Sequence, residues 1–130
     1  MNGSPPRILV VDDDAEICDA YDQILRAHGF EVTTAQSRAE AMAALDQPDA
    51  DFEVLILDIA LPDADGADVA HEIAARLGQR PTLYVSGWTD EFWNLSDAPG
   101  RWLVMQKPIS VPRLLEAIDW LVGRRPSRPD

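Results

Sequence analysis

The chain carries at positions 54–58 the stretch Val54-Leu55-Ile56-Leu57-Asp58, four apolar residues closed by a carboxylate. A short continuous apolar run of this kind is typical of a strand that is covered on both faces, as in a parallel sheet. Binding sites of open parallel sheets form beyond the carboxyl ends of their strands. The stretch therefore predicts a central strand with a polar site at its end.

Outward from this strand, apolar runs of strand length alternate with helical patterns. The other expected strands are residues 8–11, 30–34, 82–86 and 102–105. Ser37 and Glu40 form a capping box for a helix, and Ser110 caps the last helix, whose buried face is expected to include Val111. This alternation predicts one α/β domain with a parallel sheet and five helices. Pro99-Gly100 interrupts the stretch from Trp88, so the fourth helix is expected to be short or irregular.

Length and composition narrow the class of protein further. A chain of 130 residues has room for one domain, and its net charge of −12 argues against nucleic acid as a partner. No apolar run is long enough to span a membrane, and the single cysteine, Cys18, indicates a reducing, cytoplasmic setting. We expect an N-terminal extension at 1–6, the domain at 7–122 and a flexible tail at 123–130, with no output domain attached.

Polar residues stand where the expected strands end. Asp12 and Asp13 follow the first strand, Asp58 closes the third, Ser86 closes the fourth and Lys107 follows the fifth. Because the carboxyl ends of parallel strands share one edge of the sheet, these side chains are expected to converge. Asp14 is explained more simply, as the N-cap or a first-turn acid of the first helix.

The chemistry of this set points to phosphoryl transfer. Crowded carboxylates repel unless a cation joins them, and oxygen ligands favour a hard divalent ion such as Mg²⁺. Asp13 and Asp58 with one backbone carbonyl would form such a site, and Asp58 would be a carboxylate nucleophile. Lys107 and the hydroxyl of Ser86 would stabilise the phosphoryl oxygens.

At this point the chain resembles the receiver domains of bacterial two-component response regulators, over roughly residues 7–122. The matching pieces are Val10-Val11-Asp12-Asp13, Asp58-Ile59-Ala60-Leu61-Pro62 with Gly66, Ser86, and Lys107-Pro108. Each piece is common alone, but their order and spacing together are specific. The resemblance implies a flavodoxin-like, doubly wound sheet of order 2-1-3-4-5.

The resemblance also implies roles for individual residues and partners. Asp58 would take phosphate from a histidine kinase or a histidine phosphotransfer protein, and the chain would catalyse only its own phosphorylation and dephosphorylation. Asp13 and the carbonyl of Ala60 would bind Mg²⁺ directly, with Asp12 acting through a water. The Lys107–Pro108 peptide is commonly cis in this family, which would aim the lysine into the site.

The chain also departs from the family pattern. Val104 stands where most receivers have the Tyr or Phe of the phosphorylation switch, and Gly87 and Trp88 follow Ser86. The run from Pro81 to Trp88 resembles a diverged Pro-Phe-x-Phe-Ala-Thr-Gly-Tyr motif, which marks a subgroup of stand-alone receivers.

Two hypotheses for the function follow from the matching pieces and the departures. One is a phosphoacceptor that signals through changed affinity for another protein, and the other is a pseudo-receiver that binds protein without phosphate.

The four tryptophans leave a second question open. Trp88, Trp93, Trp102 and Trp120 all lie in the last third of the chain. One interpretation is that they fill space left by a short fourth helix. The other is that they form a partner or homodimer surface with the expected fourth helix, the strand at 102–105 and the last helix, since large aromatics anchor interfaces.

Overall fold

The computed structural model describes residues 5–87, 95 and 97–123, and five parallel strands form its single sheet. The strands are β1 (Arg7–Val11), β2 (Glu31–Ala35), β3 (Val54–Asp58), β4 (Thr82–Ser86) and β5 (Trp102–Gln106). Their order is β2-β1-β3-β4-β5, which confirms the predicted flavodoxin-like, doubly wound arrangement. β2 is an edge strand and begins one residue later than predicted, whereas every residue of β3 is buried.

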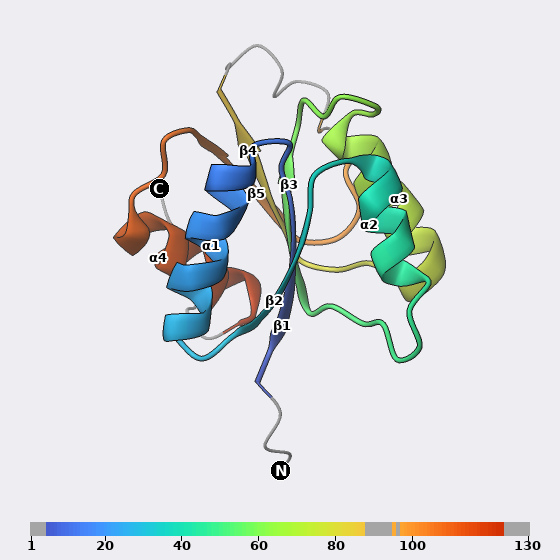
Figure 1. Cartoon of the computed structure of the whole chain (residues 1–130). Helices are drawn as coiled ribbons and strands as arrows, with labels where there is room; N and C mark the ends of the chain where they lie inside the picture. The colour runs from blue at the N-terminus through green and yellow to red at the C-terminus, as the bar shows by residue number, and fades with distance from the viewer. Residues whose placement is uncertain (1–4, 88–94, 96, 124–130) are drawn as a thin grey trace.

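Helices cover both faces of the sheet, which is seen edge-on in Figure 1. α1 (Ala15–Ala27) and α4 (Val111–Leu121) lie on one side, and α2 (Arg38–Leu45) and α3 (Gly66–Leu77) lie on the other. The described residues thus hold four helices where the sequence predicts five. The predicted fourth helix falls on a stretch of which residues 88–94 and 96 lie outside the described part, so α4 corresponds to the predicted last helix.

The sheet divides the interior into two apolar clusters. Ile8 and Val10 of β1 point toward α1 and α4, while Leu9 and Val11 point toward α2 and α3. This alternation follows from the period of two along a strand. Close to Asp58, Ile56 packs in one cluster and Leu57 and Ile59 pack in the other, so the backbone around Asp58 is held from two sides.

Side-chain caps begin the helices as the sequence predicts, with one correction on a helix face. Asp14, Ser37 and Ser110 are the N-caps of α1, α2 and α4. Val111 was expected on the buried face of the last helix, but it is 39% exposed. It lines an open groove beside α1, so the apolar contacts of α4 begin one turn later, at Leu114. Within the described residues, every helix is too short or too polar to cross a membrane.

Candidate functional site

The predicted site residues lie together at the carboxyl edge of the sheet. Val11 pairs with Leu57 in the register of β1 and β3, so Asp12 and Asp58 end neighbouring strands. The backbone N–H of Lys107 donates to the carbonyl of Ser86 at 2.8 Å, which joins the ends of β4 and β5. The sheet order that the family resemblance implies therefore brings the segments together as expected.

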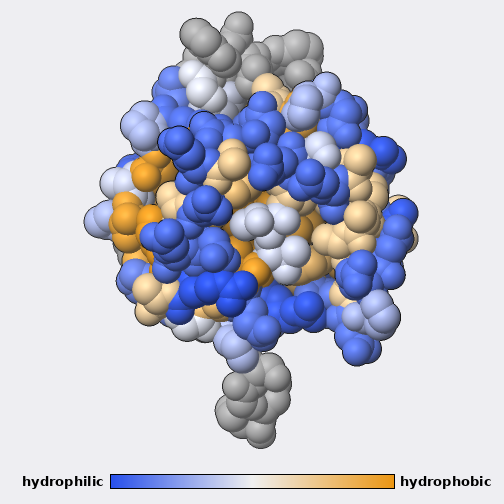
Figure 2. Space-filling model, viewed as in Figure 1, coloured by the Kyte–Doolittle hydropathy of each residue, from blue (hydrophilic) through white to orange (hydrophobic). Residues whose placement is uncertain are grey.

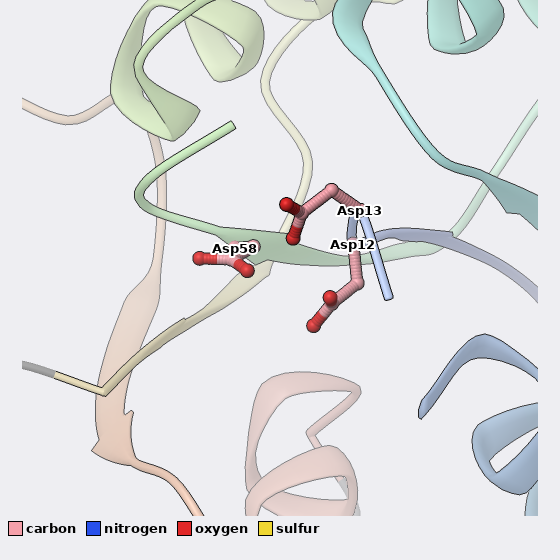
Figure 3. A group of neighbouring side chains, drawn as sticks. All are labelled: Asp12, Asp13 and Asp58. Carbon is pink, nitrogen blue, oxygen red and sulfur yellow. The ribbon is translucent and has the colours of Figure 1, made fainter. Parts of the chain in front are cut away.

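Three carboxyl groups form the centre of this edge. Asp12, Asp13 and Asp58 each offer an oxygen, and these oxygens lie within 4.8 Å of one another. Figure 3 shows Asp12 and Asp13 reaching from the end of β1 toward Asp58 at the end of β3. Asp12 is 2% and Asp58 6% exposed, whereas Asp13 is exposed to solvent. At this degree of burial, Asp12 is not a solvent-exposed loop acid.

The ammonium group of Lys107 is the counter-charge of the two buried carboxylates. Its Nζ lies 2.8 Å from Oδ2 of Asp12 and 3.0 Å from Oδ2 of Asp58. The Lys107–Pro108 peptide is cis, as the family resemblance implies. Lys107 is also the only lysine of the chain.

The remaining carboxylate oxygens are held by backbone N–H groups. Asp58 Oδ1 accepts from Ala60 at 3.0 Å, and Asp12 Oδ1 accepts from Asp14 at 3.0 Å. Asp14 itself caps α1 by accepting from Glu16 at 2.9 Å, which confirms its structural role. Each buried carboxylate is thus fixed by one backbone bond and one ammonium contact.

Burial and the ion pairs shift the pKa values of Asp58 and Lys107 in opposite directions. Burial raises the pKa of Asp58 above its usual value, although hydrogen bonds from Lys107 and Ala60 oppose that shift. Burial also opposes the charge of Lys107, but the hydrogen bonds and charges of Asp12 and Asp58 outweigh it and raise the pKa of the ammonium group. The lysine therefore stays charged at neutral pH.

Gly66 allows the chain to pass close to the carboxylate cluster. A Cβ atom built on Gly66 would clash with the backbone carbonyl oxygen of Asp58. Because that contact is with backbone, any larger residue would displace the strand end itself. Only glycine fits between the start of α3 and the end of β3.

The donor set fits a divalent cation of the Mg²⁺ type. All the side-chain donors are carboxylate oxygens, and three negative charges face one ammonium group. Mg²⁺ takes one or two carboxylates and completes its shell with waters and phosphate oxygens. Asp13 and Asp58, with Ala60 at the start of the loop that follows Asp58, are the residues that would hold it.

Of the two predicted switch positions, Val104 and Trp88, the structure describes only Val104. Trp88 lies outside the described residues, whereas Val104 is half-buried and packs on the cluster under α2 and α3. Sequence reasoning missed Tyr84, which is fully buried on that side. Its hydroxyl has no hydrogen-bond partner among the residues that the structure describes. The signal available was an aromatic residue in the middle of the predicted strand at 82–86, every residue of which is buried.

The predicted tryptophan surface is only partly described, because Trp88 and Trp93 lie outside the described residues. Trp102 makes an edge-on contact with Tyr84, with the ring centroids 6.1 Å apart. The guanidinium of Arg101 lies over Trp120, 3.8 Å from the ring centroid. Both rings are half-buried and in contact with their own chain, which favours the space-filling interpretation for these two.

An apolar groove of about 220 Å³ lies beside Lys107, between α1 and the start of α4. Ile17, Tyr21 and Ile24 form its α1 wall, and Pro108 and Val111 are among the residues of the other wall. Figure 2 shows hydrophobic atoms at the surface over α1 and α4, within a largely hydrophilic exterior. A partner bound in this groove would lie next to the carboxylate cluster.

Comparison with known proteins agrees with the fold and the carboxylate cluster described above. The family model for the response regulator receiver domain matches residues 8–119. Transcriptional regulatory protein PrrA of Mycobacterium tuberculosis is 35% identical over 127 residues, covering 94% of this chain and 52% of PrrA. The chain thus spans about half the length of the curated relatives it matches.

Solved structures extend this likeness to three dimensions. A CheY-like receiver domain protein from Methanospirillum hungatei has a TM-score of 0.83 and 28% identity, covering 93% of this chain and 96% of that one. Response regulator TrrA from Thermotoga maritima, in complex with Mg²⁺-BeF, has a TM-score of 0.73 and 27% identity. That alignment covers 89% of this chain and 98% of TrrA.

Proposed function

Because the chain belongs to the response regulator receiver domain family, we propose that it accepts a phosphoryl group on Asp58 in a Mg²⁺-dependent reaction. The phosphoryl donor is the phosphohistidine of a histidine kinase or a histidine phosphotransfer protein. A bond forms between a carboxylate oxygen of Asp58 and phosphorus while the phosphorus–nitrogen bond of the donor breaks. The electron pair of the broken bond remains on the histidine ring.

The observation that carries this proposal is the contact of Lys107 with both Asp58 and Asp12 in the carboxylate cluster. Phosphoryl transfer depends mainly on positioning and on charge stabilisation. Ala60 and Lys107 orient the Asp58 carboxylate through one oxygen each. Lys107 also carries positive charge toward the incoming phosphoryl oxygens, and Ser86 ends the adjacent strand with a hydroxyl to offer them. When bound by Asp13 and Asp58, Mg²⁺ neutralises the charge between carboxylate and phosphate.

The groove beside Lys107 supports a protein as the phosphodonor. A histidine that delivers phosphate must approach Asp58 from outside, and the apolar surface of α1 and Val111 lies next to that approach. Acting inside the cell, the chain would signal by changing its affinity for another protein, and it would catalyse only its own phosphorylation and dephosphorylation. A homodimer through β5 and α4 is a further proposal for its partner.

Labelling with acetyl phosphate tests the proposal directly. The wild-type chain is expected to gain one phosphoryl group in Mg²⁺, and chelation or Asp58→Asn should abolish that gain. Asp14→Asn is the matched control, because it removes the same charge from the N-cap of α1 outside the cluster. Labelling that persists in Asp58→Asn, measured by intact mass, would refute the assignment.

The pseudo-receiver is the second candidate, and Val104 at the switch position is the observation that favours it. Titration with beryllofluoride and Mg²⁺ distinguishes the two functions. A saturable spectral change that Asp58→Asn removes supports the phosphoacceptor. A silent titration of a folded chain supports a module that binds protein without phosphate.

A further inference from the structure

The loop between β3 and α3, residues 59–65, is anchored at its tip to a different helix by Asp63. Oδ1 of Asp63 accepts from the backbone N–H of Arg38 at 2.8 Å, and Oδ2 accepts from that of Ala39 at 3.1 Å. These are the first two N–H groups of α2, which have no acceptor within the helix itself. A carboxylate 24 to 25 positions away in the sequence thus caps α2.

α2 has further attachments that do not involve this loop. Ser37 Oγ accepts from the N–H of Glu40 at 3.1 Å, which is the cap that the sequence predicts. The guanidinium of Arg38 makes a bidentate contact with Glu72 of α3, with a shortest distance of 2.7 Å. The start of α2 is therefore a fixed point, to which Asp63 ties the tip of the loop.

The inner end of the same loop belongs to the carboxylate cluster. Ala60 donates its N–H to Oδ1 of Asp58 and forms an antiparallel bridge with Asp65. Leu61 donates to the carbonyl of Ala64 at 3.1 Å, which closes the loop on itself. Asp63 lies inside this closed turn, so a displacement of the tip is passed to Ala60 at its base.

We propose that Asp63 is a positioning residue for cation binding and phosphorylation at Asp58. By tying the loop to the first turn of α2, it holds the backbone of Ala60 where its carbonyl serves as a ligand. The inference rests on the proposed function, because the position of Ala60 matters to the chemistry only when the site takes a divalent cation. It assigns to an exposed residue outside the cluster a share in setting the affinity for that cation.

Binding of Mn²⁺ alone, followed by electron paramagnetic resonance of the free ion, tests the proposal without any phosphodonor. Asp63→Ala is expected to weaken Mn²⁺ binding about tenfold, the lower end of the loss seen when a residue supporting a metal ligand is removed. Ser37→Ala is the matched control, because it removes the other cap of α2 but leaves the loop attached. Urea unfolding of both variants measures how much each destabilises the fold.

The outcomes separate positioning from a merely structural role. Weakened Mn²⁺ binding in Asp63→Ala, with wild-type binding in Ser37→Ala, supports the proposal. Equal affinity in Asp63→Ala and wild type, or equal losses in both variants, overturns it. Asp13→Asn identifies the proposed metal site: if wild-type binding does not depend on Asp13, that metal site fails, and this inference fails with it.

Discussion

Tyr84 lies opposite Val104 in the register of β4 and β5, and both side chains pack on the cluster under α2 and α3. Of these two paired positions, the one on β4 carries the aromatic ring, whereas the family resemblance places an aromatic residue at the position on β5. Tyr84 is fully buried and its hydroxyl has no partner within the described residues, so burial raises its pKa. The buried hydroxyl therefore destabilises the folded, unphosphorylated chain.

Replacing Tyr84 with Phe is expected to stabilise the chain by about 1 kcal/mol, because a buried hydroxyl without a hydrogen bond costs roughly 1–3 kcal/mol. Urea unfolding of the unphosphorylated chain measures the change. Tyr21→Phe is the control, since Tyr21 borders the open groove and its hydroxyl is not among the buried groups that lack a hydrogen-bond partner in the described residues. A loss of stability in Tyr84→Phe would show that the hydroxyl has a partner.

Asp58→Asn is expected to stabilise the chain at neutral pH when no metal is present. The raised pKa means that the folded state binds the Asp58 proton more tightly than the unfolded state. That contribution to stability is present in acid and is lost as pH rises from about 4 through the raised value. The advantage of the variant should therefore shrink as pH falls toward 4.

Urea unfolding in EDTA at a series of pH values measures this difference, with Asp14→Asn as the exposed control. Addition of Mg²⁺ should stabilise the wild type and reverse the order of the two chains, because a ligand that binds only the folded state adds to its stability. An advantage of Asp58→Asn that grows in acid would contradict the assigned direction of the pKa shift.

Lys107→Met is expected to destabilise the metal-free chain by roughly 2–3 kcal/mol, since it leaves two buried carboxylates without their counter-charge. The value lies below that of a fully buried pair because a quarter of the lysine side chain is exposed. Mg²⁺ should restore much of the loss, as the cation replaces the missing charge. Thermal unfolding with and without Mg²⁺ tests this, and equal destabilisation under both conditions would count against a cation site at these carboxylates.

Val111→Asp is expected to separate the two kinds of phosphodonor. A charge in the groove should slow transfer from phosphorylated histidine kinases of the same organism at least tenfold, because it removes apolar contact and places an unpaired carboxylate where the partner would exclude water. Labelling by acetyl phosphate, which needs no docking surface, should be unchanged. If both donors are affected alike, the groove is not the docking surface.

The sequence predicted well those features that depend on neighbouring residues. Continuous apolar runs marked the strands, local caps such as Asp14 marked helix starts, and polar residues at strand ends located Asp12, Asp58 and Lys107. The strand order came from the family resemblance and was confirmed.

The features that were missed depend on contacts distant in the sequence. The caps that Asp63 supplies to α2 join positions 24 to 25 residues apart, which no local pattern reveals. The exposure of Val111 depends on how α4 sits beside α1, although its helical periodicity is apolar. The isolated hydroxyl of Tyr84 depends on what surrounds it in the folded chain.

Because Lys107 is the only lysine, a reagent that reacts with lysine side chains reports on this one position. Every other basic side chain that carries a permanent charge is an arginine, so the carboxylate cluster holds the only side-chain amine. An acylating reagent directed at lysine therefore has one target among the side chains. The acylated fraction, read from intact mass, would therefore measure the fraction of molecules in which the Lys107 amine is not paired with Asp12 and Asp58.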